Sequence, residues 1–329
     1  MNKPLGPALK KYSTNQSNPS SNQIPKPGAP VVPLQTPAMA QVNLARPVCG
    51  NVPVLTVLAV GIDYEPGGYV YGLADVIRIV RIDFTTHKVS VLTLDRAIWV
   101  EIPGISAHYG ITHGLLNQAY FYGVPAMGYY SGSAGGAGLL ADTLQKNFGL
   151  NVDNYMVVNF EAFVKIVDTL GGIDVNLPTA VDGNVSGYNL GFFNAGINHL
   201  SGAQALNLAR IREGYSTLIR DSNQDQIIKA IYQKVTSPAI IPKIPSLLQT
   251  LLGAGLTDLS PAQIQNMICL VQKMNGSNDL TLRAIPDNQY VYAWIYDQDM
   301  HQDVNIWKID FAVFRSYIAD FMQGQWPQD

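Results

Sequence analysis

The first indication of the fold is an apolar run that ends in a carboxylate, Val54-Leu55-Thr56-Val57-Leu58-Ala59-Val60-Gly61-Ile62-Asp63. Its length and its content of β-branched residues are typical of a β-strand that is buried on both faces. Such strands occur in sheets that are covered by helices on both sides. The run therefore predicts an α/β architecture with this strand near the centre of the sheet.

The segments around this strand support the same architecture. Residues 76–84 and 88–94 are expected to form a β-hairpin, because two apolar runs flank a short polar turn. Helices and further short strands alternate along the rest of the chain. Expected strands are 99–102, 155–159, 173–177 and 280–285, and expected helices are 137–148, 161–170, 221–234, 260–273 and 310–322. The pattern predicts one domain over residues 51–329, a three-layer α/β/α sandwich around a central mixed sheet.

Residues 1–50 differ in composition from the rest of the chain. They contain nine of the twenty prolines, and residues 13–23 are almost all Ser, Asn, Gln and Thr. Such a segment buries too little apolar surface to offset its conformational entropy, so it is expected to be a disordered, flexible tail. The sequence shows no apolar run long enough for a membrane anchor and no signal-peptide core.

Charge argues against a nucleic-acid-binding protein. Only 14% of residues are charged, the net charge is −3, and the pI is near 5.9, whereas nucleic-acid binding requires a basic face. Acidic residues are absent before Asp63, so the remainder of the chain carries a clear acidic excess. Clustered arginines in such a body therefore call for a specific explanation.

Several kinds of site are excluded by missing motifs. Two cysteines, Cys49 and Cys269, cannot form a thiolate metal site of four ligands. They form either one disulfide or two unrelated buried thiols, and composition favours neither. No phosphate-binding P-loop and no nucleophilic-serine motif is found. The five histidines have no metal-ligand spacing, which disfavours a histidine-based enzyme.

Arginines near residue 210 form the most distinctive polar pattern. Arg210 and Arg212 flank Ile211, and in an extended segment their guanidinium groups would project to the same side. Arg220 and Gln224 are four residues apart on a predicted helix, so they share a face. This set would make a clamp for a polyphosphate. The equally weighted alternative is a group of surface arginines that pair with nearby acidic residues, namely Glu213, Asp221 and Asp225.

Carboxylates at the ends of the first strands supply a second part of a possible site. Asp63 follows the first strand, Asp75 precedes the second, and Arg96 follows the third. The carboxylates could hold a hard cation such as Mg²⁺, although isolated aspartates more often only cap turns. Together with arginines they would suit phosphoryl transfer.

At these positions the sequence resembles the LytR–CpsA–Psr family of bacterial cell-envelope proteins over about residues 54–235. The similarity rests on several blocks in a fixed order. They are Val57-Leu58-Ala59-Val60-Gly61-Ile62-Asp63, Ala74-Asp75, Val89-Ser90-Val91-Leu92-Thr93-Leu94-Asp95-Arg96, Trp99-Val100-Glu101-Ile102-Pro103-Gly104, Asn117-Gln118-Ala119-Tyr120, Val167-Asp168-Thr169-Leu170-Gly171-Gly172-Ile173-Asp174-Val175, Leu200-Ser201-Gly202-Ala203-Gln204-Ala205-Leu206, and Arg210-Ile211-Arg212-Glu213-Gly214-Tyr215 with Arg220 and Gln224.

The resemblance implies a phosphotransferase that moves a glycopolymer from a polyprenyl-pyrophosphate lipid to peptidoglycan or another cell-wall glycan acceptor. By matching position, the pyrophosphate clamp consists of Arg96, Arg210, Arg212, Arg220 and Gln224. Asp63 and Asp75 would hold Mg²⁺ or Mn²⁺, and Asp75 would act as the base, a role that Asp63 could share. The resemblance also implies a membrane-proximal, extracytoplasmic location, which would make a Cys49–Cys269 disulfide reasonable.

The chain departs from the family pattern at four positions. Leu73 replaces an arginine, Ala97 and Thr217 stand where carboxylates are usual, and Asn223 replaces a second arginine. A site carboxylate is thus lost or displaced to Asp95. Two alternatives to transfer therefore remain open: a module that binds polyprenyl phosphates without catalysis, and a hydrolase that uses water as acceptor.

One aromatic pattern near the C-terminus is not part of this resemblance. Tyr290, Tyr292, Trp294 and Tyr296 alternate as residues on one face of a strand do. They would either pack inside a sheet, which is the favoured interpretation, or form a sugar-binding surface.

Overall fold

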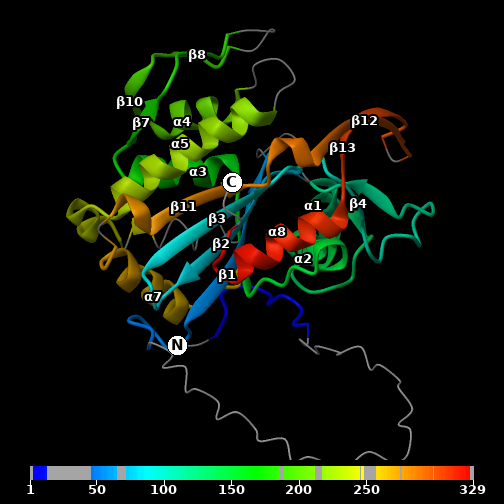
Figure 1. Cartoon of the computed structure of the whole chain (residues 1–329), viewed down its shortest axis with the longest axis horizontal. Helices are drawn as coiled ribbons and strands as arrows, with labels where there is room; N and C mark the ends of the chain where they lie inside the picture. Colours follow the sequence, from blue (N-terminus) through cyan, green and yellow to red (C-terminus); the bar gives the residue numbers. More distant parts are fainter. Residues whose placement is uncertain are drawn as a thin grey trace, which may run out of the picture.

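The computed structural model describes residues 3–12, 46–64, 72–184, 189–211, 217–244, 246–247, 257–274, 276–298 and 300–326. Its centre is a five-stranded mixed sheet (Figure 1). In spatial order the strands are β11 (Leu280–Ala284), β3 (Lys88–Leu94), β2 (Ala74–Asp83), β1 (Val54–Ile62) and β6 (Asn154–Val158). β2 is antiparallel to β1 and β3, whereas β6 is parallel to β1 and β11 is parallel to β3.

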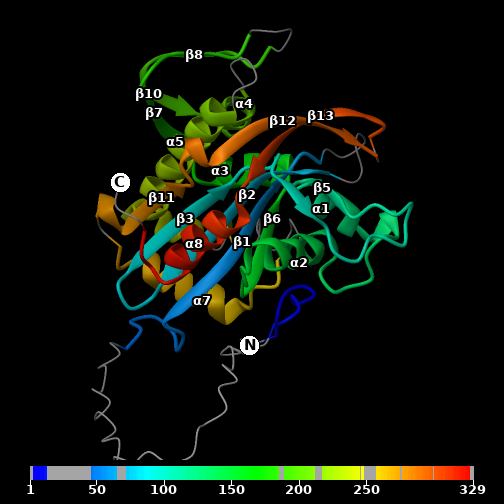
Figure 2. The same cartoon turned by 45° about the vertical axis from the view of Figure 1, so that its right-hand side comes forward.

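Helices cover both faces of this sheet, as predicted (Figures 1 and 2). One face is covered by α3 (Phe160–Thr169), α4 (Gly202–Arg210) and α5 (Thr217–Val235). The other face is covered by α1 (Gln118–Gly123), α2 (Gly135–Phe148) and α8 (Phe311–Met322), while α7 (Pro261–Val271) lies near the start of β1. The predicted α/β/α sandwich with a mixed sheet is confirmed, and the expected hairpin of residues 76–94 is the β2–β3 pair.

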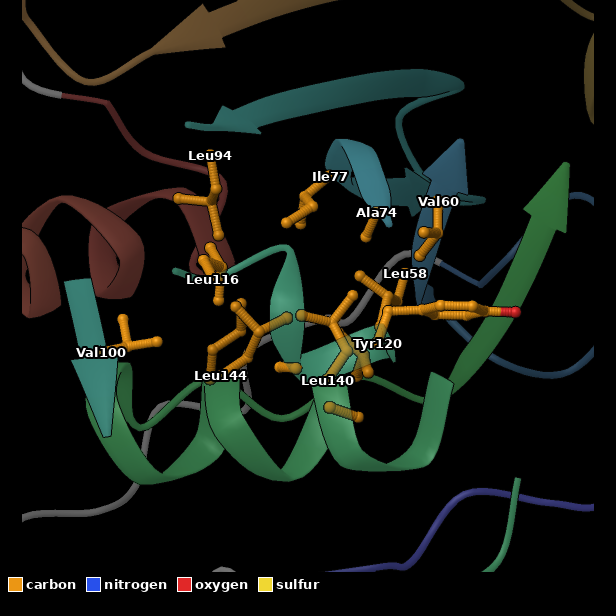
Figure 3. Close-up of a cluster of buried hydrophobic side chains, with 14 of the residues drawn as sticks. Leu58, Val60, Ala74, Ile77, Leu94, Val100, Leu116, Tyr120, Leu140 and Leu144 are labelled. Atoms are coloured by element: carbon orange, nitrogen blue, oxygen red, sulfur yellow. The ribbon is translucent and has the colours of Figure 1, made fainter. Parts of the chain in front are cut away.

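The two faces of β1 are filled very differently. Leu58 and Val60 point into the main core, where they meet α2 residues such as Leu140 and Leu144 (Figure 3). The intervening positions on the opposite face are the small residues Ala59 and Gly61. Side chains of this size leave space between the sheet and α3, α4 and α5, and that space is the site described below.

The remaining strands form small two-stranded sheets at the rim of the molecule. They pair as β4 (Trp99–Glu101) with β5 (His113–Leu115), β7 (Ile173–Leu177) with β10 (Gly196–Leu200), β8 (Val181–Asp182) with β9 (Phe192–Phe193), and β12 (Tyr290–Asp297) with β13 (Gln302–Ile309). Short 3₁₀ turns occupy Pro125–Met127, Pro238–Lys243, Ser277–Asp279 and Asp287–Gln289. Two helix starts carry complete capping boxes, as the sequence suggests: Ser201 with Gln204 and Ser260 with Gln263.

The N-terminal segment differs from the predicted flexible tail over residues 3–12. Leu9 is buried in the main core, and its backbone N–H donates to Asp258. The hydroxyl of Tyr12 donates to Asp142 over 2.5 Å, and Lys11 reaches the carbonyl of Asp153. One buried leucine and several hydrogen bonds thus hold this short stretch against the body of the protein. Residues 13–45, with most of the prolines, lie outside the described residues.

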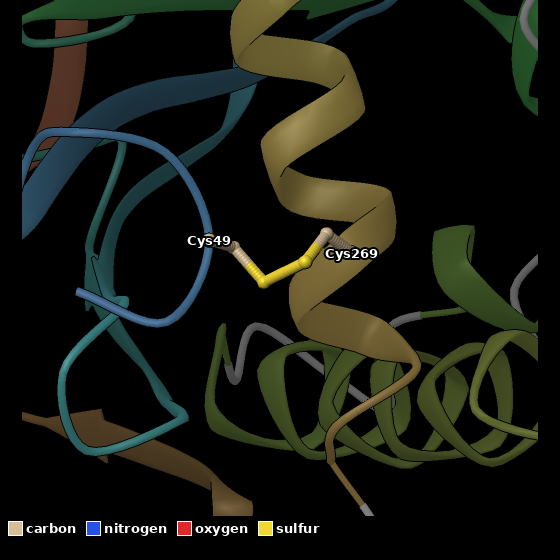
Figure 4. Close-up of a disulfide and its surroundings, with 2 residues drawn as sticks. All are labelled: Cys49 and Cys269. Atoms are coloured by element: carbon tan, nitrogen blue, oxygen red, sulfur yellow. A yellow bond between two sulfur atoms is a disulfide. The ribbon is translucent and has the colours of Figure 1, made fainter.

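Cys49 and Cys269 form a disulfide, which decides between the two possibilities left by composition (Figure 4). The bond joins the loop before β1 to α7, two segments that are 220 residues apart in the sequence. Both cysteines belong to a small apolar cluster with Leu55, Phe84 and Met274. The disulfide therefore fixes the position of α7 against one end of the sheet.

Candidate functional site

A cavity of about 620 Å³ lies between the sheet and helices α3, α4 and α5. Most of its wall is apolar and includes Ala59, Val158, Phe163, Ile227 and Ile231. Besides Asn159, six polar side chains line it: Asp63, Asp75, Arg78, Arg210, Arg220 and Gln224. Five of these six are residues that the sequence analysis proposed for the site, and they come from four different elements or their ends. The cavity thus offers an apolar body and a charged end, which suits an amphiphilic ligand.

Arg220 and Gln224 lie on one face of α5, as their spacing predicts. Arg220 is only 3% exposed, and its Nε and Nη1 atoms have no hydrogen-bond partner among the described residues. Among the described residues it forms an ion pair with Asp221, with 3.7 Å between Nη2 and Oδ1. A buried guanidinium with unpaired donors costs free energy unless an anion satisfies it. Arg220 is therefore the strongest indication of an anionic ligand in this cavity.

Arg78 is a site residue that the sequence analysis missed. It lies inside β2 and is 3% exposed. Its guanidinium donates to Thr93, to Asp225 over 2.6 Å and to the Gln224 side-chain oxygen over 3.3 Å. The available signal was an arginine flanked by apolar residues in the middle of a predicted strand, because such a charge is rarely buried without partners. Arg78 holds Gln224 and α5 against the sheet.

Arg210 contradicts one detail of the predicted clamp. The sequence analysis placed Arg210 and Arg212 in an extended segment, but Arg210 is the last residue of α4. Its exposed guanidinium lies 4.9 Å from the centre of the Phe160 ring, at the start of α3. The backbone becomes extended only at Ile211, the C-cap of α4, so Arg210 still belongs to the last helical turn. Arg212 lies outside the described residues.

The carboxylates Asp63 and Asp75 meet at the polar end of the cavity. Asp63 follows β1 and accepts a hydrogen bond from the Leu73 backbone N–H over 2.5 Å. Burial raises the pKa of Asp63, and the nearby negative charge of Asp75 raises it further, although the Leu73 N–H and Arg96 oppose this. Asp75 forms an ion pair with Arg96 and accepts a hydrogen bond from Asn117 at 3.5 Å. The predicted proximity of these groups is thus observed.

Arg96 does not line the main cavity with the other arginines. It lines a second cavity of about 350 Å³, next to Leu73, Asn117, Met300 and Asn305. Because Arg96 pairs with Asp75, and Asp75 lines the main cavity, the Arg96–Asp75 pair separates the two spaces. The Asp75 carboxylate lines the main cavity, and its partner Arg96 lines the second one.

The departures at Ala97 and Asn223 leave visible consequences. Asp95 does not replace the lost carboxylate, because it lines neither cavity and its Oδ1 caps the following turn by accepting from the Ala97 N–H. Asn223 is buried, and its Nδ2 has no hydrogen-bond partner among the described residues.

Burial also raises the pKa of Asp221 to about 6, and the negative charge of Asp95 contributes, while Arg220 opposes the increase.

Asp63 and Asp75 could hold a divalent cation only if a bound phosphate group and water supplied the remaining ligands of the cation. Among the described residues, no cluster of three or more Asp, Glu, His or Cys side chains is placed to hold a metal ion. Asp63 and Asp75 are nevertheless close enough for their charges to interact. Mg²⁺ is commonly held by one or two carboxylates together with substrate phosphates and water. Two carboxylates beside an anion-binding arginine match that arrangement.

An α/β/α sandwich whose apolar cavity ends in arginines and carboxylates defines a protein that binds an amphiphile with an anionic head. Residues 36–310 match the LytR_cpsA_psr family, and the chain therefore belongs to it.

Individual relatives share the sequence or the fold over most of the chain. One is the polyisoprenyl-teichoic acid–peptidoglycan teichoic acid transferase TagU of Oceanobacillus iheyensis, which is 30% identical over 233 residues, 70% of this chain and 66% of TagU. The regulatory protein MsrR of Staphylococcus aureus is 28% identical over 274 residues, 82% of this chain and 74% of MsrR. A structure of TagT bound to LIIa-WTA superposes with a TM-score of 0.59 at 20% identity, covering 82% of this chain and 90% of TagT.

Proposed function

We propose that the protein transfers a glycopolymer phosphate from a polyprenyl-pyrophosphate carrier to a cell-wall glycan such as peptidoglycan. The observation that carries this proposal is the cavity with an apolar wall and the buried, unpaired Arg220 at its charged end. A prenyl chain would fill the apolar part, and the pyrophosphate would satisfy the free donors of Arg220. The names of the relatives TagU and TagT bound to LIIa-WTA support a substrate of this class.

In the proposed reaction, an acceptor hydroxyl oxygen attacks the phosphorus that carries the glycopolymer. A new P–O bond forms to the acceptor, the P–O bond within the pyrophosphate breaks, and polyprenyl monophosphate leaves with the bonding electrons. Asp75 takes the hydroxyl proton, because its carboxylate lines the main cavity and pairs with Arg96, which lines the second one. Arg220 and Arg210 orient the pyrophosphate, with Arg212 as a further proposed contact, and Gln224 adds an amide donor.

Asp63 and Asp75 are the residues that would hold Mg²⁺ or Mn²⁺. A bound cation would offset the charge of the pyrophosphate. Arg96 pairs with Asp75 and fixes the direction of its carboxylate. We further propose that the protein works near the extracytoplasmic face of a bacterial membrane. None of the helices in the described part of the chain combines the length and apolar composition that crossing a bilayer requires.

The test uses the full chain, a polyprenyl-pyrophosphate glycolipid, Mg²⁺ and peptidoglycan, with polyprenyl monophosphate measured by mass spectrometry. Release should require Arg220 and be lost in Arg220→Met. The matched control is Lys229→Ala, an exposed cation on the same helix that lines neither cavity, which should behave as wild type. Release without glycan transfer would indicate a hydrolase. Lipid binding without release would indicate a binding module, and absence of both would refute the proposal.

A further inference from the structure

Three aromatic side chains project into solvent from one face of strand β12. Tyr292, Trp294 and Tyr296 are 53%, 59% and 55% exposed. The favoured expectation of buried packing is thus wrong for these three residues, and of the series only Tyr290 packs inward, 5.2 Å from Phe314. Adjacent exposed rings are uncommon on soluble proteins and usually mark a binding surface.

The partner strand β13 extends this surface. Trp307 lies opposite Tyr292 in the register, and Asn305 lies opposite Trp294, so both belong to the same face of the hairpin. The Tyr292 ring lies 5.7 Å from Trp307 and 6.3 Å from Trp294, centre to centre. We refer to Tyr292, Trp294, Tyr296 and Trp307 as the aromatic face.

The aromatic face is held in place by the body of the protein. At one end of β12, the buried Asp297 accepts a hydrogen bond of 2.8 Å from Gln118 in α1. On β13, the Trp307 backbone N–H donates to the carbonyl of Ala97 over 3.0 Å. Figures 1 and 2 both place the hairpin beside β4, β5 and α1. A surface that is ordered before binding loses little entropy when a ligand arrives.

The hairpin is continuous with the proposed reaction site. Ala97, which pairs with Trp307, is the residue directly after Arg96. Asn305 lines the second cavity together with Arg96, and its side-chain oxygen accepts a hydrogen bond from the Tyr292 hydroxyl. One path therefore leads from the aromatic face through the second cavity to the Arg96–Asp75 pair.

The chemistry of this path suits a sugar chain better than a membrane. Sugar rings present C–H faces that stack on aromatic rings, while their hydroxyls need polar partners such as the tyrosine hydroxyls, Asn305 and Asp303. Among the described residues of the hairpin, Asp303 is the one charged side chain on this face, opposite Tyr296. Asp297 and Lys308 belong to the other face. An acidic group would be repelled by anionic lipid head groups.

We propose that the aromatic face binds the acceptor glycan and that the second cavity admits its reacting hydroxyl to Asp75. This inference rests on the proposed function, since it assigns the acceptor side of that reaction. Donor and acceptor would then enter from opposite sides of the Arg96–Asp75 pair.

The experiment measures binding of the full chain to purified peptidoglycan by co-sedimentation, without any donor lipid. Trp294→Ala and Tyr296→Ala should each weaken binding by about tenfold, the usual scale for loss of one stacking ring. Trp294→Phe should restore part of it. Val291→Ser is the matched control, because Val291 is 61% exposed on the opposite face of the same strand. Thermal melts verify that each variant is folded.

The outcomes separate this inference from the proposed function. If the wild type releases polyprenyl monophosphate but Trp294→Ala binds glycan as well as the wild type, the aromatic face is not the acceptor site. If the wild type releases no polyprenyl monophosphate, yet Trp294→Ala loses glycan binding, the proposed transfer reaction is refuted and the glycan-binding site is supported. The inference is overturned if the wild type does not bind glycan. It is also overturned if Trp294→Ala loses binding to anionic lipid vesicles but keeps its binding to glycan.

Discussion

Replacing Asp221 by Asn should raise the free energy of unfolding relative to the wild type, and this gain should be larger at neutral pH than at acidic pH. Burial is the main reason why the pKa of this carboxyl is raised from 3.8 to about 6 in the folded protein. The folded state therefore binds the proton more tightly than the unfolded chain, and the stability that the proton contributes is lost as pH rises through about 4 to 6. The difference between the two pKa values corresponds to about 3 kcal/mol, at about 1.4 kcal/mol per pH unit.

Asn cannot ionise, so Asp221→Asn escapes this loss while it keeps the size of the side chain. Urea unfolding of both proteins from pH 3.5 to pH 8 gives two curves of free energy against pH, and groups that titrate in both cancel in their difference. The difference should increase by about 2–3 kcal/mol between pH 4 and pH 7 and then stay level. A matched control is Ser222→Asn, an exposed position on the same helix whose side chain does not ionise before or after the change, so its difference curve should stay flat. A flat difference curve for Asp221→Asn as well would refute the reasoning.

Three further perturbations test the cavity, the disulfide and the N-terminal segment. Ala59→Phe should fill the main cavity and weaken polyprenyl-phosphate binding by at least about tenfold, as measured by lipid titration. The free energy of unfolding, measured in urea, should change by less than about 1.5 kcal/mol. Unchanged lipid affinity would contradict the assignment of the apolar wall. Replacing both Cys49 and Cys269 by Ser should lower the free energy of unfolding by about 2–5 kcal/mol, because the bond closes a loop across 220 residues; equal stability of reduced and oxidised protein would argue against the bond. Leu9→Ala should cost about 2–4 kcal/mol in the same assay, and a cost near zero would mean that residues 3–12 do not pack on the core in solution.

Local sequence signals predicted most of the fold because they act over short distances. The run that ends at Asp63, the turn at residues 85–87 and the capping boxes at Ser201 and Ser260 each specify one element, and each was observed. Arg220 and Gln224 were found for the same reason, since helix periodicity alone puts them on one face.

Features that depend on contacts between distant segments could not be predicted in this way. Arg78 joins β2 to α5 across 147 positions, and only the folded structure shows that its charge faces Asp225. Leu9 lies in a segment whose composition is that of a tail, but its burial and the hydrogen bonds of Leu9, Lys11 and Tyr12 with distant residues dock the segment on the core. The exposure of Trp294 likewise depends on the fact that no element in the described part of the chain covers this face of β12 at that position, which residue alternation does not reveal.

The arginines of the site form two pairs: two are in ion pairs with carboxylates, and two are not. This difference would allow the site to bind an anion although several charged residues of the family pattern are replaced. Arg78 and Arg96 are neutralised by Asp225 and Asp75, so they maintain the positions of α5 and of the base. Arg210 and Arg220 have no close carboxylate among the described residues apart from Asp221 at 3.7 Å. A ligand with two negative charges can therefore be satisfied by these two without breaking either structural ion pair. On the proposed function, the replacements at Leu73 and Asn223 would therefore weaken only the support around the clamp, whereas the unpaired donors of Arg220 that would contact the ligand remain.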